Sequence, residues 1–203
     1  PLELKPGCDV LLDWSELLCA FPRLTLEGPP GAELIVTYNE ATWGQDRQKG
    51  HRDDVAGKSA LPGYQDRFVT DGHKRTIETL WWRTFRYVCL DASEPMTLHA
   101  FDPVETGYPL VTESSFEADH PDVQPIWDVS VRTAERCAGE TYFDCPYYEQ
   151  LQYAGDTRIQ ALIGYYLGRD RALQRNAVET LGWSLMENGL TQSRDPGRQA
   201  QVI

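Results

Sequence analysis

The sequence predicts a mixed β and α fold, in which an N-terminal antiparallel β-sandwich over residues 1–112 precedes helices over residues 113–203. Before about residue 113, short runs of β-forming residues recur between turn signals. After it, the spacing of apolar residues changes from about two to about 3.6, which is the period of a helix. A chain of 203 residues provides one or two domains, and it is long enough to bury roughly 70% of its unfolded surface.

The β-rich part contains five runs that predict strands, at residues 23–26, 33–38, 67–70, 79–90 and 96–101. Turn residues separate them, as in Gly28-Pro29-Pro30-Gly31 and Pro62-Gly63. No helical stretch of ten or more residues intervenes, which favours a jelly-roll-like antiparallel sandwich over a βαβ array. The pair Trp81-Trp82 lies within a predicted strand and alternates across it, so we expect at least one of the two rings in the core.

The polar region from residue 41 to residue 63 is predicted to be a long exposed loop. A loop of this length is able to reach over a neighbouring site.

Three amphipathic helices are predicted after residue 113. The first follows His120-Pro121, the second begins at Asp156, and the third is opened by Asp170 and ended by Asn188-Gly189. Their apolar faces contain Val123, Ile126, Trp127, Ser130, Val131, Ala134 and Cys137; then Ile159, Leu162, Ile163, Tyr166 and Leu167; then Leu173, Ala177, Leu181, Ser184 and Leu185. Successive helices joined by short turns match the opening of a helical barrel.

Composition narrows the function classes. The chain is 41% hydrophobic and 25% charged, as expected for a soluble globular protein. It has no apolar run near the roughly 20 residues that cross a bilayer and no signal-peptide pattern at its start. A net charge of −12 without a Lys or Arg cluster argues against a nucleic-acid partner. We therefore expect neither a nucleic acid nor a membrane as partner.

The five cysteines are scattered, at Cys8, Cys19, Cys89, Cys137 and Cys145, and we expect them to be buried small hydrophobes. Their usage favours a reducing, cytoplasmic compartment, with the periplasm left open. The four histidines form no i, i+4 pair and no arrangement with a cysteine that indicates a metal site or a Cys-His dyad. We expect no metal in the site and no cofactor, and the sequence leaves open whether the sandwich holds a metal.

Residues 142–156 combine three carboxylates with four tyrosines and a phenylalanine, on a loop that leads into a helix. Carboxylic acids transfer protons and orient hydroxyls, and aromatic faces stack on sugar rings, so this mixture indicates a carbohydrate site. Each acid has a structural alternative: Asp156 caps the following helix, and Asp144 braces the loop. Glu149 has no capping position, and partial desolvation among Tyr147, Tyr148 and Tyr153 would keep it protonated as a general acid requires. Tyr165 and Tyr166 stand at helical spacing and are expected in the core.

Asp144-Cys145-Pro146, followed by Glu149 and Gly155-Asp156, resembles the signature of the bacterial α-L-rhamnosidases of glycoside hydrolase family 78. Thr191-Gln192-Ser193-Arg194-Asp195-Pro196 resembles the Ser-Arg-x-Pro stretch of that family. Phe85-Arg86-Tyr87-Val88 resembles a strand of the sandwich that precedes its catalytic barrel. One departure is Tyr147-Tyr148, which stands where many members have Arg-Asp before the glutamate.

The resemblance implies an (α/α)6 barrel, of which about three helices are present, and inverting hydrolysis of terminal α-L-rhamnosides. Glu149 would be the general acid, and Asp144, Asp156, Tyr148 and Tyr153 would hold the sugar of a rhamnose-containing oligosaccharide or glycoside. The general base of the family lies a few hundred residues after the motif, beyond Ile203.

We therefore expect an excised fragment that is inactive alone, and whose incompletely packed apolar faces favour a homodimer or solubility through the sandwich. The alternatives are another (α/α)6-barrel glycosidase and a non-catalytic carbohydrate-binding module.

Overall fold

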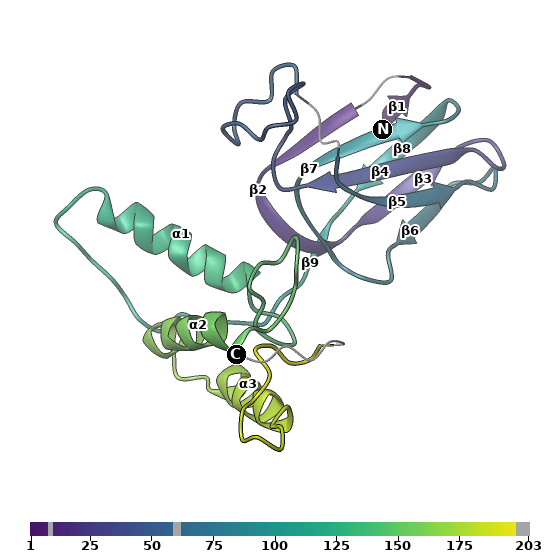
Figure 1. Cartoon of the computed structure of the whole chain (residues 1–203). Helices are drawn as coiled ribbons and strands as arrows, with labels where there is room; N and C mark the ends of the chain where they lie inside the picture. Colours follow the sequence, from purple (N-terminus) through teal and green to yellow (C-terminus); the bar gives the residue numbers. More distant parts are fainter. Residues whose placement is uncertain (8–9, 59–61, 198–203) are drawn as a thin grey trace. The chain divides into compact units, whose positions relative to one another are not determined.

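The computed structural model describes residues 1–7, 10–58 and 62–197, which form two compact units, Pro1–Thr106 and Gly107–Ile203 (Figure 1). The described part of the first unit is built from strands and that of the second from helices and loops, which confirms the predicted mixed β and α fold. Cys8, residues 59–61 of the long loop, and residues 198–203 lie outside the described part. The predicted division after residue 112 stays a prediction.

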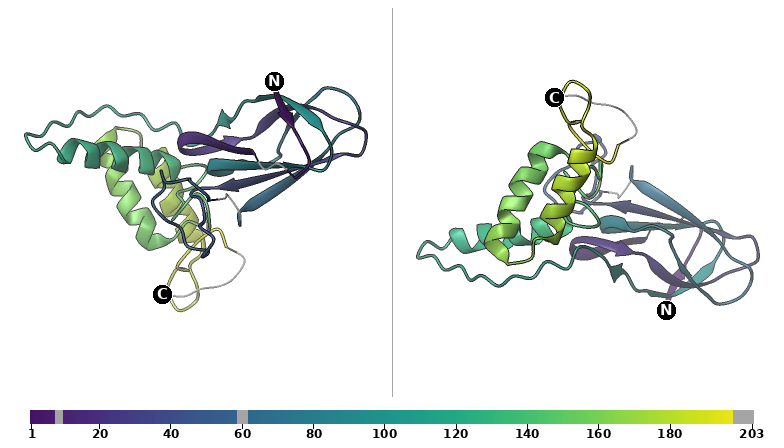
Figure 2. Two further views of the ribbon diagram at one scale, coloured as in Figure 1. Left: turned by 90° about the horizontal axis from the view of Figure 1, so that it is seen from above. Right: turned by 90° about the horizontal axis from the view of Figure 1, so that it is seen from below.

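Two antiparallel sheets form the first unit, and Figure 2 shows them as two layers. The order of one sheet is β1-β8-β3-β6, with β1 Leu2–Leu4, β8 Met96–Phe101, β3 Arg23–Glu27 and β6 Arg75–Glu78. The order of the other is β5-β4-β7-β2-β9, with β5 Tyr64–Val69, β4 Glu33–Asn39, β7 Arg83–Ala92, β2 Val10–Phe21 and β9 Val104–Glu105.

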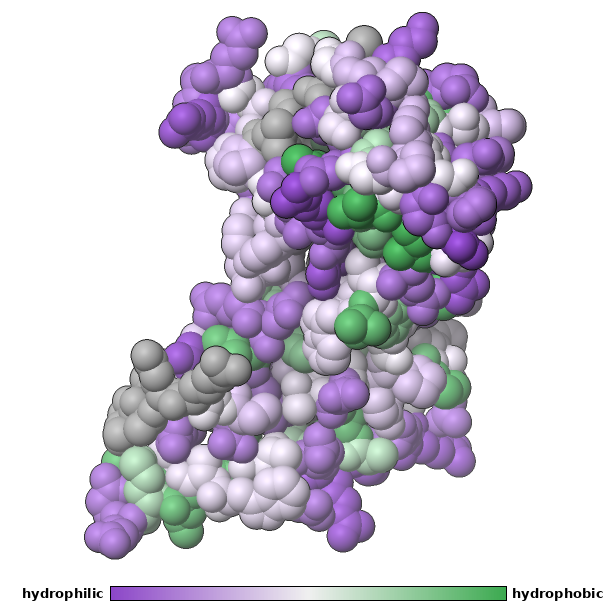
Figure 3. Space-filling view, turned by 90° about the vertical axis from the view of Figure 1, so that its right-hand side faces the viewer, coloured by the Kyte–Doolittle hydropathy of each residue, from purple (hydrophilic) through white to green (hydrophobic). Residues whose placement is uncertain are grey.

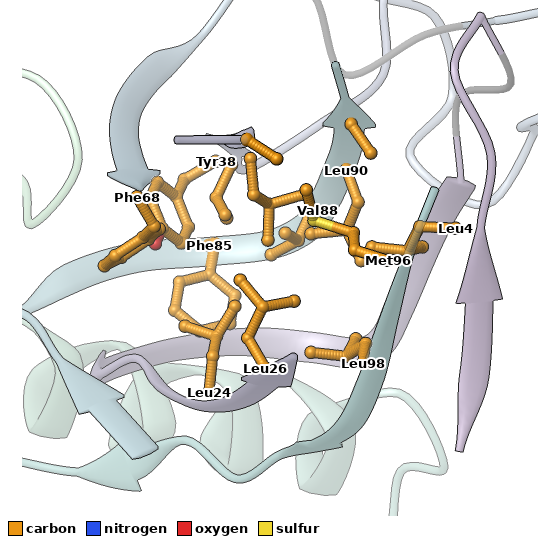
Figure 4. Packing of buried hydrophobic residues seen from close by; sticks show 14 of the residues in the cluster. Leu4, Leu24, Leu26, Tyr38, Phe68, Phe85, Val88, Leu90, Met96 and Leu98 are labelled. Carbon is orange, nitrogen blue, oxygen red and sulfur yellow. The ribbon is translucent and has the colours of Figure 1, made fainter. Parts of the chain in front are cut away.

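The hydrophobic core lies between these sheets (Figure 4). Alternate residues of β3 and β8, such as Leu24 and Leu98, are buried together with Val36, Phe85 and Leu90 of the opposite sheet. Each fully buried side chain of this size contributes roughly 1.5 to 3 kcal/mol. Tyr87 and Cys89 pack with Leu11 in a separate cluster, so β7 is covered on both faces.

The structure corrects one predicted strand. The run 79–90 divides into a turn and β7, because the Thr79 hydroxyl donates to the Trp81 carbonyl at 2.7 Å before the strand begins at Arg83. Trp82 is buried and Trp81 is half exposed, so the expectation of at least one core ring is confirmed.

Strand β2 is twelve residues long and was not predicted. Its pairing with β7 shifts register between Asp13 and Leu18, and Ser15 adopts φ 67° with its N–H on Asp13 Oδ1 at 2.7 Å. This bulge interrupts the alternation of apolar residues that marks a strand in sequence.

A buried arginine joins β2, β7 and the long loop. Arg86 is 8% exposed and donates from Nε to Asp13 Oδ1 at 2.9 Å and from Nη1 to Asp53 Oδ1. The Tyr87 hydroxyl donates to the Arg52 carbonyl beside it. The described part of loop 41–63 is therefore fastened to the sheet at residues 52 and 53, although most of its side chains are exposed as predicted.

The second unit contains α1 (Val123–Arg136), α2 (Ala154–Leu167) and α3 (Ala172–Trp183), and α2 contacts both other helices. Its hydrophobic cluster is small, with Ala138, Tyr142, Leu173 and Ala177 at the centre. Many large apolar side chains of the helices remain exposed, among them Ile126, Ile159, Leu162, Tyr165, Tyr166, Val178 and Trp183. The expectation that Tyr165 and Tyr166 are core residues is therefore wrong for this chain.

Two predicted helix ends are also wrong. The second helix begins at Ala154, because Tyr153 is extended (ψ 141°) and pairs with Arg194. Asp156 is the third helical residue, where a carboxylate interacts favourably with the helix dipole but does not cap it. The third helix ends at Trp183, and Gly189, with φ 82°, lies in a later turn.

We expect Arg86→Met to lower the free energy of unfolding by about 1 to 3 kcal/mol, because it removes charge-assisted hydrogen bonds from a buried position. The matched change Arg23→Met breaks an exposed pair with Glu78 and is expected to cost less than about 1 kcal/mol. Urea unfolding of the chain measures both values. Equal effects of the two substitutions would contradict the importance of the Arg86 network.

The ion pair between Arg86 and Asp13 also predicts that stability depends on pH. Hydrogen bonding to Arg86 lowers the pKa of Asp13 in the folded protein. The stabilisation that the Asp13 carboxylate provides is therefore present above its pKa in the unfolded chain. It is lost as the pH falls through its pKa in the folded protein. Between about pH 5 and pH 3, wild type should lose more free energy of unfolding than Arg86→Met.

Candidate active site

The loop that carries the predicted acids is closed at its base by Asp144 and Leu151. The Asp144 N–H donates to the Leu151 carbonyl at 2.9 Å, and the Leu151 N–H donates to Asp144 Oδ1 at 2.9 Å. Within the loop, Gln150 adopts φ 56°, and its N–H donates to the Cys145 carbonyl at 3.1 Å. The Asp144 carboxylate thus braces the loop, which is the structural role weighed for it from sequence.

The paired tyrosines of the loop differ in exposure. Tyr147 is buried and Tyr148 is 50% exposed, and their rings meet edge to face with centroids 4.7 Å apart. Tyr147 therefore helps to anchor the loop, whereas Tyr148 offers an aromatic surface to solvent. Cys145 is half-buried, and its Sγ accepts from the Glu149 N–H at 3.4 Å, so this thiol also has a place in the loop structure.

Glu149 is exposed, so the expectation of partial desolvation among the tyrosines is wrong for this structure. Its carboxylate is held by a neighbour instead: the Tyr153 hydroxyl donates to Glu149 Oε2 at 2.6 Å. Arg194 Nη1 donates to the Tyr153 hydroxyl oxygen at 2.8 Å, and its guanidinium lies 5.5 Å from the centre of the Tyr153 ring. The hydrogen bond to Glu149 raises the pKa of Tyr153, so this hydroxyl keeps its proton.

The backbone places Arg194 beside Tyr153, although they are 41 residues apart in sequence. The two residues form an antiparallel bridge. The Ala154 N–H donates to the Ser193 carbonyl at 2.9 Å, and the Asp195 N–H donates to the Gln152 carbonyl at 3.2 Å. The Ser-Arg-x-Pro stretch singled out in the sequence is therefore part of the same site as Glu149.

Gln152 is a site residue that the sequence did not indicate. It is only 1% exposed. Its Oε1 accepts from the Tyr142 N–H at 3.3 Å, and its Nε2 donates to Thr180 Oγ1 and to the Asp195 carbonyl, each at 2.9 Å. A lone glutamine carries no periodicity signal, so nothing in the sequence marks it as buried.

Asp156 is exposed in the first turn of α2, three residues after Tyr153. The structure thus joins Glu149, Tyr153 and Arg194 by hydrogen bonds, and it places Asp144 at the base of the same loop. Within the described ranges there is no group of three or more His, Cys, Asp or Glu side chains that could hold a metal ion. The face shown in Figure 3 is mostly hydrophilic, with hydrophobic residues in small separate groups.

A second feature lies in the sandwich unit, where an open cleft of about 480 Å³ is lined by residues of β1, β2 and β8. Trp14 and Phe101 line it together, with ring centroids 4.9 Å apart. Asp13 and His99 add polar groups to its wall. In the portion of the chain that the structure describes, no helix is long and apolar enough to span a bilayer.

Residues 112–200 match the family model described as the bacterial alpha-L-rhamnosidase 6 hairpin glycosidase domain, so the matched class is a glycosidase. The resemblance expected from the Asp-Cys-Pro motif, to bacterial α-L-rhamnosidases of glycoside hydrolase family 78, is thereby confirmed. None of the curated proteins matches the chain.

Solved structures show the same fold. The GH78 family rhamnosidase of Bacillus sp. GL1 has a TM-score of 0.78 at 24% identity, over 94% of this chain and 19% of that one. The rhamnosidase from Klebsiella oxytoca with rhamnose bound has 0.74 at 20%, over 100% and 41%. The alpha-L-rhamnosidase from Dictyoglumus thermophilum has 0.74 at 15%, over 98% and 23%. The chain thus spans between 19% and 41% of the length of these enzymes.

We expect Asp144→Ala to loosen the loop from Asp144 to Leu151, the acid loop, because the Leu151 N–H loses its carboxylate acceptor. Native-state hydrogen exchange should show the Leu151 amide exchanging about tenfold faster, corresponding to about 1.4 kcal/mol of lost protection. Asp156→Ala, which changes an exposed carboxylate in the same segment, should leave that rate unchanged. Equal exchange in wild type and Asp144→Ala would remove the bracing role.

Proposed function

We propose that this chain is the part of an exo-acting α-L-rhamnosidase that carries its general acid, Glu149. The supporting observation is the hydrogen-bonded series Glu149, Tyr153 and Arg194, which lies inside the segment matched to a glycosidase domain. An exposed carboxylic acid held by a tyrosine can meet a glycosidic oxygen that approaches from solvent. The matched enzymes are much longer than this chain, and we propose an α-L-rhamnoside as the substrate of the whole protein that contains it.

In the proposed reaction, Glu149 gives its proton to the glycosidic oxygen as the bond to the sugar breaks. A second carboxylate, outside residues 1–203, activates water on the opposite face of the ring and so inverts the configuration. The two carboxyl groups of such a pair are about 6.5 to 9.5 Å apart, which leaves room for that water.

The remaining site residues would hold the terminal rhamnose. Asp156 and the Oδ2 atom of Asp144 would accept hydrogen bonds from ring hydroxyls, and the exposed ring of Tyr148 would stack on the sugar. Tyr153 would contact the sugar beside Glu149. Contacts that strengthen as the sugar becomes positively charged would lower the barrier rather than only the ground state.

The proposal extends to the architecture of the helical unit and of the sandwich. We infer that α1, α2 and α3 are the first helices of an (α/α)6 barrel, and that the sandwich is of jelly-roll type. The exposed apolar side chains on the helices, such as Ile159, Val178 and Trp183, support this, because further helices would cover them. A different glycosidase with the same barrel would share these features, and a panel of glycosides separates it from a rhamnosidase.

In the full-length protein, Glu149→Gln should lower kcat on methyl α-L-rhamnoside by about a hundredfold or more, because its alkoxide leaving group needs a proton and the amide has none to transfer. The matched control is Glu179→Gln on α3, which removes an exposed glutamate paired with Arg175 and should leave kcat within about twofold. Residues 1–203 alone should release no 4-nitrophenol from 4-nitrophenyl α-L-rhamnopyranoside. Full activity of Glu149→Gln, or activity on another glycoside but none on the rhamnoside, would refute the assignment.

The cleft of the sandwich supports a second candidate, a non-catalytic carbohydrate-binding module. If it is correct, residues 1–112 alone, checked for folding by circular dichroism, should bind rhamnose-containing oligosaccharides in calorimetry. Absence of binding by the folded sandwich, together with hydrolysis by the full-length protein, would eliminate this candidate.

A further inference from the structure

With Glu149 accepting through Oε2, the hydrogen bonds from Arg194 to Tyr153 and from Tyr153 to Glu149 run in one direction. A guanidinium donates and has no acceptor, so the Tyr153 hydroxyl oxygen accepts from Arg194 Nη1 at 2.8 Å. The single hydroxyl proton is then free for Glu149 Oε2, 2.6 Å away. Since Oε2 already accepts this proton, an acidic proton on Glu149 belongs on Oε1.

We propose that Arg194 is a positioning residue for acid catalysis: by fixing the direction of the Tyr153 hydroxyl, it reserves Glu149 Oε1 for the proton that is transferred. This inference rests on the proposed function, because it assigns the geometry of the acid named there. Arg194 acts through Tyr153 and needs no contact with the substrate.

The surroundings of Arg194 favour a fixed position. Its backbone pairs with Tyr153, and the flanking residues bond to the same strand-like segment on both sides. Buried Gln152 ties that segment to the Asp195 carbonyl at 2.9 Å. The Nε atom of Arg194 is buried with no hydrogen-bond partner among the described residues. The guanidinium is therefore partly desolvated, which strengthens its bond to the Tyr153 oxygen.

This arrangement also assists the transfer itself. When the proton leaves Oε1 for the glycosidic oxygen, the electrons of the broken bond stay on that oxygen, the departing group leaves as a neutral alcohol, and Glu149 becomes a carboxylate. The Tyr153 hydrogen bond to Oε2 then becomes charge-assisted and stronger. Because it gains strength as charge develops, it stabilises the transition state more than the bound substrate.

The leaving group gives a test that a merely structural role would not pass. A nitrophenolate departs without a proton, whereas an alkoxide needs one. In the full-length protein, Arg194→Met should lower kcat for methyl α-L-rhamnoside about tenfold or more, with KM little changed, and lower kcat for the 4-nitrophenyl substrate less than about threefold. Tyr153→Phe should show the same pattern. Arg194→Lys, which keeps an N–H donor, should recover part of the loss.

The double variant decides whether Arg194 acts through Tyr153. In a protein that already carries Tyr153→Phe, adding Arg194→Met should lower kcat no further, since the hydroxyl to be oriented is gone. Arg171→Met is the matched control, because Arg171 also lies over a tyrosine ring, that of Tyr165, at 4.7 Å. This variant should leave kcat unchanged for both substrates. Thermal unfolding checks that each variant folds; if Arg194→Met does not, Arg194→Lys and Tyr153→Phe carry the test.

Equal losses on both substrates, or additive effects in the double variant, would overturn the positioning role. Failure of the underlying function has a different signature: Glu149→Gln would then keep its activity on methyl α-L-rhamnoside, or the wild-type protein would hydrolyse neither rhamnoside. If Glu149→Gln shows the leaving-group pattern and Arg194→Met does not, Glu149 is the acid and the inference about Arg194 is wrong.

Discussion

The candidate site depends on the side chain of Gln152, which is buried and forms hydrogen bonds with three separate segments of the helical unit. It accepts from the N–H of Tyr142 where the site segment begins, donates to Thr180 on α3, and donates to the carbonyl of Asp195. An amide is suited to this position because it accepts and donates without charge, so it can be buried at low cost when its bonds are made. The acid loop and the stretch that holds Arg194 are thereby fastened to the same point.

The two units use different physical means to hold their loops. The sandwich has a large apolar core between its sheets, and its long loop is fastened by the buried charge of Arg86. The helical unit has a small cluster around Tyr142 and Leu173 and leaves many apolar side chains exposed. Its acid loop is held by directional hydrogen bonds, such as those between Asp144 and Leu151. Hydrogen bonds restrict direction as well as distance, which a proton-transferring group requires more than bulk packing does.

Sequence reasoning predicted the mixed fold and the three helices correctly, because these depend on periodicity. It also singled out the segment of the candidate site, because the residue types there lie close together in the chain. It missed β2, where the bulge at Ser15 breaks the alternation, and it placed the start of α2 two residues late. That start is set by the pairing of Tyr153 with Arg194, which local propensity does not contain. The same long-range pairing explains why Gln152 went unnoticed and why Arg194 was recognised in a motif without a role. The exposure of Glu149 likewise depends on how the loop folds, not on which residues it contains.

If Glu149 is the proposed general acid, the tyrosine between it and Arg194 meets a requirement that a direct ion pair would not meet. An arginine in contact with the glutamate would favour the charged carboxylate, which has no proton to give. An apolar residue in its place would leave the carboxyl group free to rotate. The hydroxyl of Tyr153 relays the direction of the guanidinium through two hydrogen bonds, of 2.8 and 2.6 Å, while it separates the positive charge from the acid. Orientation is thus kept and direct charge neutralisation is avoided, which is the combination that the general-acid role proposed for Glu149 requires.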